Sequence, residues 1–251
     1  MKQILLITDG CSNVGVSPVL AAAEAREEGI TVNVVGVIDY GTIGELGSRE
    51  IEDIARAGGG ISQIVGTRQL AHTMQMMTRK TVVQTIQQAV NRELTQILGD
   101  KGSAKTVTDL EPAQRSQVVE VMDNMAETAT LQVSLLIDVS ASMKPKLASV
   151  EEGIRDLMLS LQARVGKSRL SVFHFPGRHS GEHAVMDIDW TDDPGRVRSL
   201  FGRLQTKGAT PTGPAIQKVI DFYRYGTLEE QQEIEGNYRI EREGMLGDNV
   251  V

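Results

Sequence analysis

Short apolar runs rich in branched residues alternate along the chain with longer segments in which apolar residues recur every three or four positions. The short runs are typical of buried parallel strands, and the longer spacing is typical of helices that bury one face. The predicted strands are residues 4–8, 30–39, 61–65, 131–138, 169–175 and 183–190. The predicted helices are residues 18–28, 49–57, 67–98, 112–127, 146–164, 192–204 and 214–225. The segment 67–98 is either one helix or two that meet near residues 78–81. This alternation predicts an α/β fold with a parallel sheet.

The two halves of the chain are expected to share one sheet. Each half supplies only about three strands, too few to bury both faces of a sheet alone. We therefore expect one domain over residues 1–225, with helices on both faces of the sheet. Residues 183–190 alternate apolar and polar side chains, which indicates an edge strand. Residues 100–129 are expected to form a linker with its own helix. Residues 226–251 are expected to form a mobile tail, because seven acidic residues face only two arginines there.

Composition and charge exclude several kinds of partner. The chain has 251 residues, a formal net charge of -7 and a pI near 5.2, whereas nucleic-acid binding needs clustered lysine and arginine. No apolar run approaches the roughly 20 residues that cross a bilayer. The amino terminus is expected to form a strand rather than a signal peptide, and the one cysteine, Cys11, can form no internal disulfide. We expect a cytoplasmic protein without nucleic-acid or membrane partners.

Oxygen-bearing side chains follow the ends of predicted strands. Asp138 ends one strand, and Ser140 and Ser142 follow it in the turn. Thr210 lies in a tight loop before the last helix, and Asp9 follows the first strand. Hydroxyl and carboxylate oxygens suit Mg²⁺ or Mn²⁺. Neutral hydroxyl ligands would leave such a cation able to accept a further carboxylate from outside the chain.

These motifs resemble the von Willebrand factor A family and its metal-ion-dependent adhesion site. The resemblance rests on D-x-S-x-S at 138–142, G-x-T-x-T-G at 208–213 and T-D-G at 8–10. It implies a doubly wound, mostly parallel Rossmann-like sheet with one antiparallel edge strand. It also implies a divalent cation, Mg²⁺ or Mn²⁺, that bridges to an acidic residue of a partner protein. The metal-site residues implied are Asp9, Asp138, Ser140, Ser142 and Thr210. The hydroxyls would meet the metal directly or through water, and the two aspartates would hold bound waters.

The order of the motifs departs from the family pattern. D-x-S-x-S comes first in the family and T-D-G last, whereas T-D-G opens this chain. The order predicts a circular permutation in which residues 2–99 form the usual carboxy-terminal half and residues 130–225 the amino-terminal half. The linker 100–129 would then join the usual ends. A domain-swapped homodimer, with each site shared between two chains, is the alternative to a monomer.

The resemblance favours a non-enzymatic, metal-dependent protein-binding module, expected in a bacterial cytosol. The alternative is a Mg²⁺-dependent phosphohydrolase with Asp138 as nucleophile, although Ser140 stands where that chemistry needs a second acid. A purely structural alternative is a helix cap in which the hydroxyls satisfy backbone N–H groups. Thr212 is expected to cap the last helix, and Ser12 and Asn13 to shape the loop beside the metal.

Overall fold

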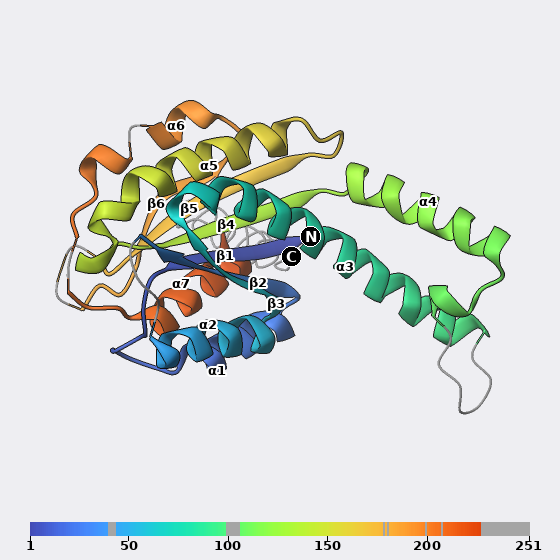
Figure 1. Cartoon of the computed structure of the whole chain (residues 1–251), viewed down its shortest axis with the longest axis horizontal. Helices are drawn as coiled ribbons and strands as arrows, with labels where there is room; N and C mark the ends of the chain where they lie inside the picture. The colour runs from blue at the N-terminus through green and yellow to red at the C-terminus, as the bar shows by residue number, and fades with distance from the viewer. Residues whose placement is uncertain are drawn as a thin grey trace, which may run out of the picture.

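The computed structural model describes residues 1–39, 44–98, 106–177, 179, 181–198, 200–206 and 208–226 (Figure 1). Within these residues, six strands form one sheet in the order β3-β2-β1-β4-β5-β6. The strands are β1 (Lys2–Thr8), β2 (Ile30–Ile38), β3 (Gly59–Gly66), β4 (Leu131–Asp138), β5 (Ser168–Phe175) and β6 (Val185–Thr191). Neighbouring strands are parallel except for β5 and β6, which are antiparallel. The predicted mostly parallel sheet with one antiparallel edge strand is confirmed.

Helices cover both faces of the sheet, as Figure 1 shows. One face carries α3 (Leu70–Leu98), α5 (Leu147–Gln162) and α6 (Pro194–Arg198). The opposite face carries α1 (Pro18–Glu27), α2 (Glu45–Ala57) and α7 (Thr212–Tyr225). The α2 helix begins earlier than the predicted start at residue 49, because Gly44 rather than Ser48 precedes its first turn. The doubly wound arrangement expected of a Rossmann-like fold is therefore present.

The two halves of the chain meet where β1 lies beside β4. The strands pair in parallel from Lys2 opposite Gln132 to Ile7 opposite Ile137. Both strands are almost entirely buried, because each has a strand on either side and helices above and below. This explains the uninterrupted apolar runs of residues 4–7 in β1 and 135–137 in β4. The sheet is continuous across the two halves.

The segment predicted as 67–98 is one α-helix, α3, preceded by a short 3-10 turn at Thr67–Gln69. Its first half packs on the sheet, and the helix then runs past the sheet, where α4 (Pro112–Thr128) packs beside it (Figure 1). Much of the predicted linker is thus the α4 helix, although residues 99–105 lie outside the described part. Residues 227–251, nearly all of the predicted tail, also lie outside it. No helix in the described ranges is long and apolar enough to span a bilayer.

Candidate metal centre

The candidate site forms at the carboxyl ends of β1 and β4. Thr8 is the last residue of β1 and Asp138 the last of β4, so the parallel register brings both to the same edge. The chain leaves β1 toward β2 and leaves β4 toward β5, which lie on opposite sides. Ligand sites of open α/β sheets lie at such a reversal, because the two connections diverge and leave a crevice between them.

Asp138 is fully buried, with hydrogen bonds to both carboxylate oxygens. Thr8 Oγ1 donates to Oδ2 at 2.7 Å, and the Ser140 backbone N–H donates to Oδ1 at 2.7 Å. Burial raises the pKa of Asp138 to about 6, although these hydrogen bonds act to lower it; the negative charge of Asp9 adds a smaller upward push. The backbone contact also holds the turn that carries both serines against the end of β4.

The two serine hydroxyls converge with Asp9. Ser140 Oγ lies 3.2 Å from Ser142 Oγ, and Ser142 Oγ donates to Asp9 Oδ1 at 2.8 Å. Ser142 belongs to the 3-10 turn Ala141–Lys146, which follows Ser140 directly and leads into α5. The tight turn places alternate side chains of D-x-S-x-S near one point. Four of the five residues predicted for the metal site, namely Asp9, Asp138, Ser140 and Ser142, are brought together in this way.

Thr210 reaches the same edge through the loop that follows β1. Asn13 N–H donates to the Thr210 carbonyl at 3.1 Å, and Thr210 N–H donates to Asn13 Oδ1 at 2.8 Å. The Thr210 side chain is buried but makes no hydrogen bond to the other predicted site residues within the described chain. The expectation that Asn13 shapes this loop agrees with the paired contacts.

The expected capping role of Thr212 is wrong. Thr212 is the first residue of α7, Pro211 occupies the cap position, and no side chain caps the helix. The Thr212 hydroxyl is buried and has no hydrogen-bond partner among the described residues. A buried hydroxyl without a partner usually costs about 1–3 kcal/mol. The start of α7, two residues after Thr210, therefore contains a polar atom that the described chain does not satisfy.

Lys146 is part of the site, although its motif position did not suggest it. Its ammonium group donates to Asp9 Oδ2 and to the Ser142 carbonyl, the latter at 3.2 Å. The exposed fraction of the side chain is 11% for Lys146 and 4% for Asp9. One feature of the sequence could have indicated this role: Lys146 lies four residues after Ser142, so its side chain can reach back over one turn. Most lysines are solvated, however, so the pattern did not distinguish Lys146 from the exposed Lys144.

The residues present fit a hard divalent cation. Oxygen ligands about 2.1 Å from an octahedral cation lie about 3 Å apart when adjacent, and the two serine oxygens are separated by 3.2 Å. The described residues contain no group of three or more histidine, cysteine, aspartate or glutamate side chains placed to hold a metal. A cation at this edge would therefore depend on hydroxyl ligands, with Asp9 and Asp138 as acceptors for its bound waters.

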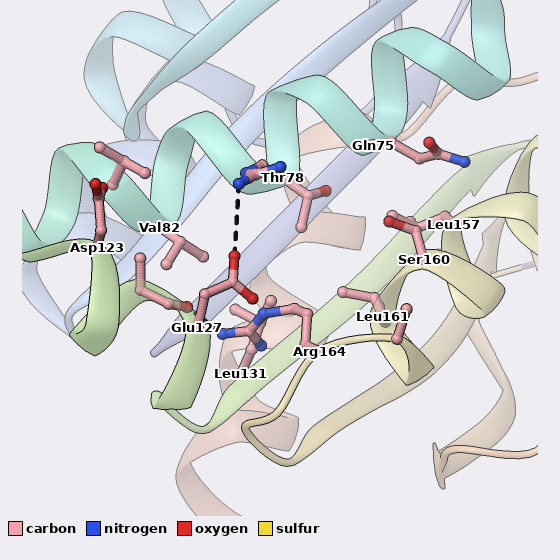
Figure 2. A pocket seen from close by; sticks show the side chains of 14 residues that line it. Gln75, Thr78, Val82, Asp123, Glu127, Leu131, Leu157, Ser160, Leu161 and Arg164 are labelled. Carbon is pink, nitrogen blue, oxygen red and sulfur yellow. Dashed lines mark hydrogen bonds and ion pairs between the residues drawn. The ribbon is translucent and has the colours of Figure 1, made fainter.

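A separate cavity of about 510 Å³ lies between α3, α4 and α5 (Figure 2). Its apolar lining includes Val82, Leu131 and Leu157. The Arg164 guanidinium in its wall donates to the carbonyl oxygens of Ala126 and Ala129, so it serves the local fold. Leu131 begins β4 and Asp138 ends it, so the cavity and the metal site are about 23 Å apart at roughly 3.3 Å per strand residue. The cavity is not part of the candidate metal centre.

No protein-family model matches the chain. The chain is 46% identical over 218 residues to the uncharacterized protein YabS of Bacillus subtilis (strain 168), covering 87% of each. It is 40% identical to an uncharacterized protein from Alicyclobacillus acidocaldarius of known crystal structure, with a TM-score of 0.80, covering 89% of this chain and 93% of the other.

A further match is proximal thread matrix protein 1 of the mussel byssus, in a structure with a zinc-occupied MIDAS motif. It shows 14% identity and a TM-score of 0.26, covering 83% of this chain and 43% of that one, and at this level it carries no argument. The first two matches, in contrast, extend over most of both chains at high identity. The chain belongs to the family of Bacillus subtilis YabS.

Proposed function

We propose that this chain is a circularly permuted von Willebrand factor A domain that binds a partner protein through a divalent cation. The observation that carries the proposal is the convergence of Asp9, Ser140 and Ser142, which come from different halves of the chain. The cation, Mg²⁺ or Mn²⁺, would be held by the hydroxyls of Ser140, Ser142 and Thr210. It would supply a coordination position for a carboxylate oxygen of an acidic partner residue.

The sheet order is compatible with the permutation, and the positions of the motifs and of the antiparallel edge strand support it. If the strands are counted from β4 to β6 and then from β1 to β3, the sheet reads 6-5-4-1-2-3. From the opposite edge this is 3-2-1-4-5-6, which is also the order given by the numbering of the strands along this chain. The renumbering also places D-x-S-x-S, after the first strand, before T-D-G, after the fourth, which is the order of the motifs in the family. It makes the antiparallel edge strand the third. A change of chain order at the linker therefore leaves the strand order unchanged.

Some residues of the site would bind the cation directly, and others would hold its bound waters or the surrounding loops in place. Ser140 and Ser142 present neutral oxygens, which leave the cation short of electron density and able to bind a further anion. Asp9 and Asp138 would accept hydrogen bonds from cation-bound waters, in addition to those they already accept from the protein. The Asn13 contacts hold the Thr210 loop beside the T-D-G loop.

The buried state of Asp138 weighs against the phosphohydrolase alternative. A carboxylate nucleophile must reach the phosphorus atom, but Asp138 is fully buried and both of its oxygens accept hydrogen bonds. Phosphatase activity on p-nitrophenyl phosphate that Asp138→Asn abolishes and Thr210→Ala leaves intact would favour that alternative. We expect no such activity, and we infer a binding rather than an enzymatic role.

The first experiment is a calorimetric titration with Mn²⁺. We expect one ion per chain for the wild type and loss of binding in Asp9→Ala and in Ser140→Ala. Ser160→Ala is the matched control, because Ser160 is an exposed serine beside the distant cavity. Binding that survives both site substitutions would refute the proposed site.

A second measurement addresses the partner chemistry. Water-proton relaxation reports the exchangeable waters on protein-bound Mn²⁺, and acetate serves as a minimal carboxylate probe. We expect acetate to lower the relaxation enhancement by displacing a bound water. An unchanged enhancement at acetate concentrations that leave Mn²⁺ bound would argue against a free coordination position for a carboxylate.

A further inference from the structure

A buried cationic side chain lies inside the candidate cation site. The Lys146 ammonium contacts Asp9 Oδ2, while the other oxygen of Asp9 accepts a hydrogen bond from Ser142. The lysine is thus separated from a proposed metal ligand by a single carboxylate. Lys144, two residues earlier in the same turn, is exposed.

Because Lys146 is buried, its charge acts more strongly on neighbouring groups than the charge of an exposed lysine. An exposed lysine is screened by water and salt, whereas a charge with 11% of its side chain exposed is screened much less. The lost hydration of a buried ammonium group must be compensated by a partner, and Asp9 is that partner here. The ion pair is therefore a fixed part of the local electrostatics.

The ion pair changes the net charge that a metal would meet. Asp9 and ionised Asp138 together would offer two negative charges to a divalent cation. The Lys146 ammonium cancels one of them, so the cluster of Asp9, Asp138 and Lys146 carries only one net negative charge. A partner carboxylate would restore the missing charge when it joins the cation.

We propose that Lys146 holds the site's affinity for divalent cations low, so that metal and an acidic partner bind cooperatively. This inference rests on the proposed metal site and adds its regulation. A carboxylate that improves metal binding must itself bind better when the metal is present, because the coupling between two ligands is reciprocal. The site would then remain largely metal-free until a partner of the right charge arrives.

The test compares Mn²⁺ affinity, measured by the electron paramagnetic resonance of free Mn²⁺, in four proteins. They are the wild type, Lys146→Met, Lys146→Arg and the control Lys144→Met. Methionine keeps the length of the side chain without its charge, and arginine keeps the charge. We expect Lys146→Met to bind Mn²⁺ about tenfold more tightly, which is within the usual range of coupling effects. Lys146→Arg and Lys144→Met should stay close to the wild type.

Acetate provides the second readout. We expect acetate to strengthen Mn²⁺ binding in the wild type and to do so less in Lys146→Met. If Lys146→Met does not fold, as judged by circular dichroism, Lys146→Gln tests the same loss of charge while keeping a donor for Asp9.

The outcomes separate this inference from the proposed function. Equal or weaker Mn²⁺ binding in the uncharged Lys146 variant, with binding retained in the wild type, would overturn the inference and leave the metal site standing. Absence of Mn²⁺ binding in both proteins would overturn the metal site itself. Binding seen only in the uncharged variant would support both.

Discussion

Ser142 Oγ donates a 2.8 Å hydrogen bond to Asp9 Oδ1 although 133 positions separate the two residues in the sequence. The contact forms because β1 and β4 are neighbours in the sheet and end at the same edge. Each half of the chain holds part of the candidate site, and neither half holds all of it. The site therefore depends on the same strand pairing that joins the two halves into one domain.

The chain is expected to build each metal site alone, as a monomer of 27.3 kDa. When Asp9→Ala and Ser140→Ala are mixed, unfolded and refolded together, Mn²⁺ binding should not return, because every chain lacks one necessary residue. In a domain-swapped dimer, mixed pairs would contain one intact site, and a fraction of the binding would recover. Calorimetry on the refolded mixture, with mass from light scattering, distinguishes the two arrangements.

The metal-free protein should lose stability as pH rises through about 6, the pKa of buried Asp138. The folded state holds this proton where the unfolded chain has released it, so the stabilisation is complete below the unfolded pKa and is lost above the folded one. We expect the wild type to lose about 1–2 kcal/mol of unfolding free energy between pH 5 and pH 7.5, relative to Asp138→Asn. Urea unfolding in EDTA at both pH values measures the difference.

The Asp138→Asn comparison serves as the control for this pH effect, because every other titrating group is the same in both proteins. A wild-type curve that runs parallel to that of Asp138→Asn would show that Asp138 is ionised in the folded protein over this whole range. Saturating Mn²⁺ at pH 7.5 should stabilise the wild type, since a ligand that binds only the folded state shifts the unfolding equilibrium.

Gly213→Ala should weaken both the fold and the metal site. A Cβ atom at Gly213 would lie 2.0 Å from the Val16 carbonyl oxygen, so the loop after β1 would have to move away from α7. Overpacking of this kind costs about 1–3 kcal/mol. The same movement would disturb the contact between Asn13 and Thr210, so we expect a loss of Mn²⁺ affinity as well.

Gly202→Ala is the matched control, because a Cβ atom there would meet nothing within 4 Å. Urea unfolding and Mn²⁺ titration on both variants check the prediction. If Gly213→Ala matches the control in stability and in Mn²⁺ affinity, the packing of the loop after β1 against α7 does not hold the site together.

The apolar pattern predicted most helices and strands well, because buried positions need apolar side chains and burial is therefore visible in the sequence. Strands β1 and β4 are covered on both faces and contain the apolar runs 4–7 and 135–137, whereas the edge strand β6 alternates apolar and polar residues over positions 186–191. The start of α2 and the cap of α7 were predicted wrongly, since Ser48 and Thr212 are favourable cap residues that the backbone does not use as caps. Local preference is weak enough for tertiary packing to override it.

The sequence by itself determined which oxygen-bearing residues lie at strand ends, and the spacing of D-x-S-x-S placed Ser140 and Ser142 in one turn. Only the tertiary structure decided that Asp9 meets Ser142, that Thr8 holds Asp138 and that Lys146 is buried against Asp9. The physical reason is that these contacts depend on which strands become neighbours in the sheet. Which strands pair is decided by packing over the whole domain. The apolar periodicity of a segment, in contrast, shows only whether that segment is buried.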